Sequence, residues 1–128
     1  MKNLFTVLLL FLFLIACQDY DEDVVPLVGT YEAQIVAVSN PFTMAVSYDS
    51  NDDIFIDALF DGVEWATVSA DIDNEEEALK RIKVPEQTIW DNISIEGEGF
   101  FLDNSMQLDY TIYYTSGEVD YTLVATKL

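Results

Sequence analysis

Two short segments concentrate the oxygen-bearing side chains that could bind a metal ion. Calcium prefers clustered carboxylate and carbonyl oxygens, and both segments lie at or beside expected turns. The first has the spacing of the start of a calcium loop, but Ile54 and Phe60 replace the Gly and Glu that such a loop needs. Turn formation explains the same residues, so calcium binding is one alternative. The candidate ligands are Asp49, Asn51, Asp53, Asp71 and Asp73.

Catalytic chemistry finds little support among the other residue types. The chain has no His and one Cys, which leaves its Ser and Thr hydroxyls without an imidazole base and excludes zinc sites of the Cys/His kind. Paired carboxylates could act as acid and base, but 24 acidic residues make such pairs common by chance. Lys80 and Lys83 are flanked by charges, which argues against buried, activated amines. The sequence therefore predicts neither an enzyme nor a cofactor.

The charge balance excludes further classes of partner. Five basic residues against 24 acidic ones give a net charge of −19 over 128 residues. Nucleic acids and anionic lipid surfaces both attract basic proteins, so neither is an expected electrostatic partner. A hydrophobic content of 51% still suits one ordinary folded domain.

The first residues have the pattern of a targeting segment. Lys2 precedes an apolar run over residues 4–16, which is shorter than the roughly 20 residues of a membrane-spanning helix. We expect residues 4–15 to be helical. The string Leu14-Ile15-Ala16-Cys17 resembles the lipobox of bacterial lipoproteins. This resemblance implies a signal peptide over residues 1–16, cleavage before Cys17, and a lipid anchor on Cys17 that attaches the protein to a membrane.

Residues 17–26 are expected to form a solvated tether. Four of the six residues from Gln18 to Asp23 are acidic, and this stretch has no apolar anchor that could pack. It resembles the acidic export signal of surface lipoproteins in Bacteroidota. The resemblance implies an outer-membrane protein exposed at the cell surface, although a plain spacer would have the same composition.

The remainder, residues 27–128, is predicted to be one all-β domain. Apolar and polar residues alternate in short runs separated by turns, and no long helical period is present. Residues 78–81 could add one helical turn, and Pro85 is expected to end a short strand. We predict an eight-stranded antiparallel meander closed into a barrel, with a two-sheet sandwich as the alternative. The expected strands cover about 28–38, 42–48, 54–60, 63–72, 82–84, 92–102, 106–112 and 119–126.

Charge decides which face of each strand points inward. Acidic side chains facing the lumen would lie unpaired in a narrow space, at a cost of several kcal/mol each. The apolar faces should therefore form the interior, which argues against a membrane-spanning barrel. The inward set includes Ile56, Ile95, Leu108, Tyr110 and Leu123, and the outward set includes Glu32, Asp57, Glu96, Asp109 and Asp120.

The domain also resembles lipocalin-like, or calycin-like, lipoproteins of Bacteroidota. The matching strings are Val28-Gly29-Thr30-Tyr31 and Ile95-Glu96-Gly97-Glu98-Gly99, followed by the segment from Leu108 to Ile112. The resemblance implies a possible ligand site inside the barrel and carries over no catalytic residue. Gly97 and Gly99 are interpreted as a bend, and Trp90 as an exposed aromatic residue in a loop. The candidate interior residues are Tyr31, Ile56, Phe60, Trp65, Phe101, Tyr110 and Tyr121.

Two functions follow, both without catalysis. In the first, a lipid-anchored barrel holds a small apolar or amphipathic ligand. In the second, the barrel is filled and its surface docks onto another envelope protein. A lined cavity would favour the first, and a packed interior with an exposed aromatic patch would favour the second.

Replacement of the only thiol tests the lipid anchor. Cys17→Ser should abolish membrane attachment without unfolding the domain, because Cys17 lies outside every expected strand. Cell fractionation with metabolic lipid labelling measures the outcome. A variant that remains membrane-bound would contradict the lipobox interpretation.

Overall fold

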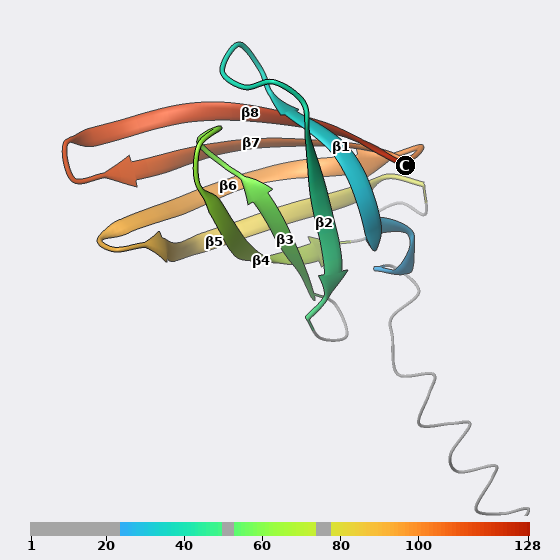
Figure 1. Cartoon of the computed structure of the whole chain (residues 1–128). Coiled ribbons are helices and arrows are strands. Elements are labelled where there is room, and N and C mark those ends of the chain that lie inside the picture. Colours follow the sequence, from blue (N-terminus) through green and yellow to red (C-terminus); the bar gives the residue numbers. More distant parts are fainter. Residues whose placement is uncertain (1–23, 50–52, 74–77) are drawn as a thin grey trace, which may run out of the picture.

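The computed structural model describes residues 24–49, 53–73 and 78–128, which form a 3-10 helix and eight strands (Figure 1). The expected signal helix and Cys17 lie outside the described residues. In order, the elements are η1 (Val25–Leu27), β1 (Gly29–Ile35), β2 (Phe42–Tyr48), β3 (Asp53–Leu59), β4 (Trp65–Asp73), β5 (Lys80–Trp90), β6 (Ile93–Leu102), β7 (Ser105–Tyr114) and β8 (Gly117–Lys127).

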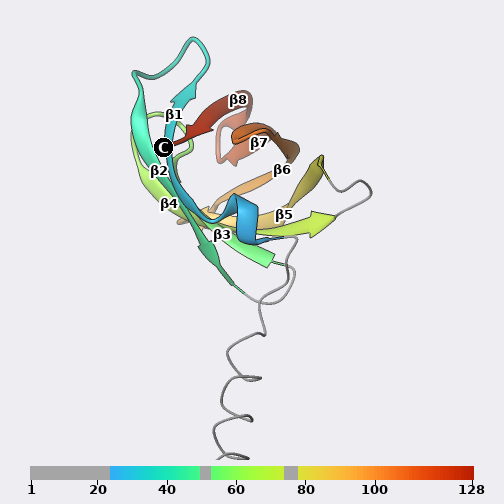
Figure 2. The ribbon, with the colours of Figure 1, turned by 90° about the vertical axis from the view of Figure 1, so that its right-hand side faces the viewer.

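The strands form one closed antiparallel barrel, as predicted. Each strand pairs with the next along the chain, and β1 pairs with β8 to complete the circle (Figures 1 and 2). The closing register places Ala33 opposite Ala125, and the backbone N–H of Leu128 donates to the carbonyl of Thr30 over 2.9 Å. Closure pairs the outer edges that a sandwich would leave open.

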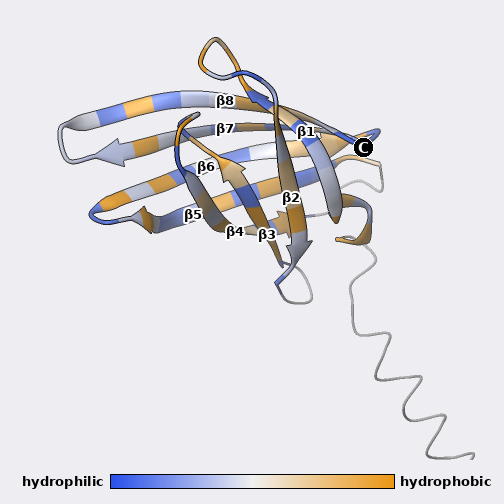
Figure 3. Cartoon of the chain, viewed as in Figure 1, coloured by the Kyte–Doolittle hydropathy of each residue, from blue (hydrophilic) through white to orange (hydrophobic). Residues whose placement is uncertain are grey.

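The predicted faces are confirmed. Apolar and polar residues alternate along the strands, as the colours of Figure 3 show along β5 to β8. The five residues expected to point inward are all at most 4% exposed. Four of the five acids expected to face water are exposed, and Asp57 is half-buried with its carboxylate bonded to the hydroxyl of Thr67. A one-residue slip in any strand would invert this arrangement.

Several expected boundaries are wrong, and Pro85 explains the largest error. β5 begins at Lys80, which leaves no helical turn at residues 78–81, and it continues through Pro85 to Trp90. The expectation that Lys80 is not buried is also wrong, because its place on the inward face of β5 leaves it only 6% exposed. Pairing of β5 with β4 stops at Lys83, and the register with β6 shifts between Val84 and Gln87. Pro85 therefore lies at a bulge, where its missing N–H breaks no ladder hydrogen bond.

β4 and β5 have no backbone pairing beyond the short region from Lys83 to Arg81. Two side chains connect the strands beyond this region. The Gln87 amide donates to the carbonyl of Ser69 and accepts from the N–H of Ser69, each over 2.8 Å, as a neighbouring backbone would. The Trp90 indole N–H donates to the carbonyl of Trp65 over 3.0 Å. Side-chain hydrogen bonds thus complete the barrel where backbone pairing ends.

Close approach of β7 explains Gly97 and Gly99 in the middle of β6. A Cβ atom added at Gly97 would overlap the carbonyl oxygen of Asp109, and one added at Gly99 would overlap that of Gln107. These obstacles are backbone atoms, which cannot move aside as a flexible side chain could. The glycines are therefore explained by packing of the two strands, without a ligand.

Neighbouring residues on β7 test the face assignment. Leu108→Ala should lower the free energy of unfolding by about 2–5 kcal/mol, because it empties space in a packed interior. Asp109→Asn should be near neutral or slightly stabilising, since its side-chain oxygen can still accept the Thr122 hydroxyl, 2.7 Å away, while one repelling charge is removed. Chemical denaturation of the two variants checks both values, and a reversed order would mean an acidic interior.

Candidate functional site

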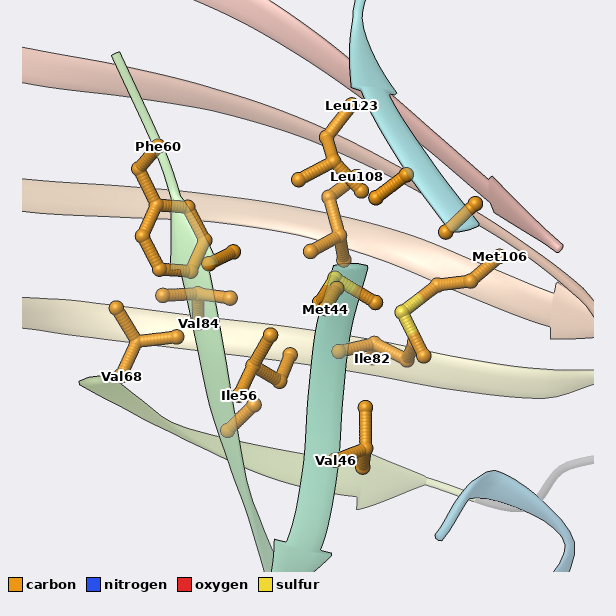
Figure 4. Close-up of a cluster of buried hydrophobic side chains, with 14 of the residues drawn as sticks. Met44, Val46, Ile56, Phe60, Val68, Ile82, Val84, Met106, Leu108 and Leu123 are labelled. Carbon is orange, nitrogen blue, oxygen red and sulfur yellow. The ribbon is translucent and has the colours of Figure 1, made fainter. Parts of the chain in front are cut away.

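Side chains fill the interior of the barrel. One cluster of inward residues runs from end to end, and every member is at most 5% exposed. Figure 4 shows side chains from facing strands meeting across the lumen, including Met44, Ile56 and Leu108. Such packing leaves the inward residues in contact with one another rather than with a bound molecule.

The helix η1 closes the end of the barrel at which the chain enters. Val24 and Leu27 are fully buried, and the hydroxyl of Tyr31 donates to the carbonyl of Leu27 over 2.5 Å. The Lys127 ammonium reaches the carbonyl of Pro26 over 2.9 Å. The folded part therefore begins before residue 27, where the sequence placed its start, because Val24 belongs to the core. We call this the entry end.

Aromatic residues close the opposite end. Phe60 is fully buried, and its ring meets that of Tyr110 edge to face with centroids 5.5 Å apart. The Tyr110 hydroxyl donates to the carbonyl of Phe60 over 2.5 Å, and burial raises the pKa of this phenol. Tyr121 stacks on Tyr110 and shares a 3.0 Å hydrogen bond with the hydroxyl of Tyr114. This end of the lumen is thus occupied by the protein's own side chains.

The structure brings six of the seven candidate interior residues into the lumen. Tyr31, Ile56, Phe60, Phe101 and Tyr110 are buried, and Tyr121 is partly buried.

Two predictions for tryptophan residues are wrong. Trp65 was expected inside, but it is 56% exposed, because β4 begins at this residue with its odd-numbered side chains facing outward. Trp90 was expected in an exposed loop, but it ends β5, half-buried and bonded to the backbone of Trp65.

Trp65 belongs to an exposed apolar surface at the end opposite η1, which we call the apolar tip. It consists of Val36, Val38, Val63 and Trp65, whose exposed fractions are 51%, 54%, 78% and 56%. The turn between β1 and β2 and the turn between β3 and β4 lie side by side there, since a Cβ added at Gly62 would be 3.1 Å from a Val38 methyl carbon. Trp65 packs edge to face against Phe42, with ring centroids 6.0 Å apart.

Hydrogen bonds hold both turns of the apolar tip. Asp61 accepts the backbone N–H groups of Val63 and Glu64 over 2.9 Å each, and Gly62 has a φ of 83° that favours glycine. In the other turn, Ala37 has a φ of 63°, a left-handed conformation that is uncommon for alanine. The Ser39 hydroxyl accepts the N–H of Ile35 over 2.9 Å. The apolar side chains are therefore displayed on turns with a defined shape.

In the described part of the chain, three of the hollows open on the outer wall rather than into the lumen. The first has a volume of about 800 Å³ and crosses β5 to β8; its lining includes Glu96, Glu98, Asp109 and Asp120. We call it the acidic groove, and its carboxylates would attract cations. The others, of about 360 and 510 Å³, both include Phe100 of β6. All three are lined mainly by outward-facing residues.

The candidate metal ligands do not converge. Asp49 accepts the hydroxyl of Ser69 over 2.9 Å, Asp53 pairs with Asp71 across β3 and β4, and Asp73 lies opposite Arg81. Asn51 lies outside the described residues. Over residues 24–49, 53–73 and 78–128, no group of three or more His, Cys, Asp or Glu is placed to hold a metal ion. Calcium binding therefore receives no support from this geometry.

Asp53 and Asp71 instead act on each other. The pKa of Asp71 is raised, first by a side-chain hydrogen bond with Asp53, then by partial burial and by repulsion from Asp53, while Lys83 partly opposes the change. A raised carboxyl pKa means that the folded state holds this proton more tightly than the unfolded chain. The resulting stabilisation is complete at pH values below the pKa that Asp71 has in the unfolded chain. It is lost as the pH rises through the pKa of Asp71 in the folded state.

Neutralising Asp71 should therefore raise the melting temperature at pH 7, and the gain should vanish near pH 3. Glu32→Gln is the control, because the cross-strand neighbours of Glu32 are Thr43 and Thr126 rather than acids. Thermal melts of Asp71→Asn and Glu32→Gln across this pH range compare the two. If both variants gained the same melting temperature at pH 7, Asp71 would have no special interaction with Asp53.

The function of this chain has to be inferred from its geometry, because comparison with known proteins finds no match. In the described part of the chain, no helix has the length and apolar character needed to cross a membrane. No protein-family model, curated protein or solved structure matches the chain.

Proposed function

We propose that this protein is a non-catalytic docking module, held at the outer membrane by lipid on Cys17, which presents its apolar tip to another envelope protein. The observation that carries the proposal is the filled barrel. Inward side chains occupy the lumen, and both ends are closed by aromatic residues bonded to backbone carbonyls. A carrier of small apolar ligands needs an open lumen instead.

The exposed surface supports docking. Soluble domains seldom gather several strongly exposed apolar side chains, and such patches commonly mark contacts with other proteins. Here three of them, Val36, Val38 and Val63, lie in two adjacent, hydrogen-bonded turns, and Trp65 begins the strand that follows one of these turns. Tryptophan is enriched among the residues that dominate the energy of protein interfaces, and Trp65 lies in this group.

The position of the apolar tip supports attachment at the other end. Residue 24, where the described chain begins, is buried beside η1, and the turn between β1 and β2 projects from the opposite side of the barrel (Figures 1 and 2). An anchor on Cys17 would therefore leave the apolar tip directed away from the membrane. Repulsion between the net negative charge of the chain and an anionic lipid layer would keep the domain off the membrane surface.

A binding assay tests the filled barrel. The wild-type chain should show no saturable binding of indole or of a fluorescent fatty acid. Phe60→Ala should gain indole binding, because removing this buried ring leaves an apolar cavity, at a cost of about 3–5 kcal/mol in the free energy of unfolding. Calorimetry and fluorescence titration of detergent-extracted protein measure both effects.

Val124→Ala is the matched control, because Val124 lies on the outer wall of β8 and its truncation opens no interior space. It should bind no more indole than the wild type. Stoichiometric binding of the fatty acid by the wild-type chain would contradict the filled barrel and favour the ligand-holding function.

A further inference from the structure

We infer that the apolar tip binds a protein surface that is apolar at its centre and carries Lys and Arg at its rim. The inference rests on the proposed docking function and adds the location and the chemistry of the partner. Three features of the described residues carry it: the charge around the tip, the fixed geometry of one of its carboxylates, and the distribution of the basic residues.

The rim of the apolar tip is acidic. Asp61 and Glu64 lie in the turn that displays Val63, and both contribute, after burial and the Tyr121 phenol, to the raised pKa of Tyr114. The chain has no Lys or Arg from residue 3 to residue 79, a range that contains both turns of the tip. A partner with basic residues around its contact would therefore meet complementary charge, which favours association and suppresses wrong partners.

One of these carboxylates is already oriented. Asp61 uses Oδ1 to accept two backbone N–H groups, so its side chain is held within the turn. A fixed carboxylate loses little conformational freedom when a cation pairs with it, and this lowers the cost of binding. The exposed Val38 and Val63 lie beside it and supply the apolar centre.

A membrane fits this surface poorly. Anionic headgroups would repel Asp61 and Glu64, and the apolar tip lies opposite the entry end, where the lipid anchor would attach.

A second copy of the chain also fits poorly. Two tips face to face would set acid against acid. Lys80, Arg81 and Lys83 begin β5 and Lys127 ends β8, at the entry end, but Arg81 lies opposite Asp73, and Lys83 lies between Asp71 and Glu98. The entry end therefore offers little net positive charge to the tip of another copy.

Zero-length cross-linking in intact cells tests the inference on the full-length, anchored protein. A water-soluble carbodiimide joins a carboxylate to a lysine amine only where the two are in direct contact. Cross-linked peptides identified by mass spectrometry should join Asp61 or Glu64 to a lysine of a different polypeptide. Such a link reports both the tip and the basic chemistry of its partner.

Two matched variants separate specific docking from chance contact. The double substitution Val38→Ser and Val63→Ser should lower the yield of these cross-links about tenfold or more, because it removes the apolar centre without touching the reacting carboxylates. Val124→Ser makes the same chemical change on the outer wall and should leave the yield unchanged. Equal protease resistance of the three proteins would confirm that each is folded.

The other outcomes overturn the inference in distinguishable ways. Links to another protein only from the acidic groove would place docking elsewhere; they would leave the filled, non-catalytic docking module standing and overturn its use of the apolar tip. Links from the tip to Lys83 or Lys127 of a second copy would indicate self-association. No link from Asp61 or Glu64, or a yield that the double variant does not lower, would remove the tip as the docking surface. Fatty-acid binding by the wild-type barrel would instead count against the proposed function.

Discussion

The structure depends on the shortage of cations that could neutralise its carboxylates. With 24 acidic and five basic residues, most acids have no counter-ion, and an unpaired carboxylate is stable only in contact with water. Because strand side chains alternate, each outward acid sends its two neighbours inward. The same requirement therefore sets the face of each strand that carries an acid, which is every strand except β2. Pairing with these strands then fixes the register of β2 and keeps acids out of the lumen.

The same kind of hydrogen bond closes both ends of the apolar lumen. At each end a buried tyrosine donates its hydroxyl to a carbonyl in the segment that covers that end: Tyr31 to Leu27, and Tyr110 to Phe60. Burial raises the pKa of both phenols, so both stay protonated donors across the physiological range. The resemblance to lipocalin-like proteins implies a ligand site in the interior. The tyrosine contacts instead close both ends of an interior that is filled by side chains.

The parts of the fold that follow from alternation could be predicted from the sequence. The barrel, its strand order and the inward set follow from period-two patterning and the turns between the runs. The path of β5 through Pro85 could not be predicted, because the bulge at Pro85 depends on the point at which β4 stops pairing with β5. Trp65 was misplaced because both faces of its segment are mixed. The expected strand over residues 28–38 includes Val36 and Val38, but β1 ends at Ile35. The apolar tip could not be predicted, because alternation alone does not show that these two valines lie in a turn.

Closure of the barrel has a consequence for how the chain is made. β1 pairs with β8, and the backbone N–H of Leu128 donates to the carbonyl of Thr30 in β1. Synthesis proceeds from the N-terminus, so one edge of β1 stays unpaired until β8 has been made. Such edges attract other extended chains. A nascent or C-terminally truncated chain would therefore expose an aggregation-prone edge, and the acidic repulsion between chains opposes that association until the circle is complete.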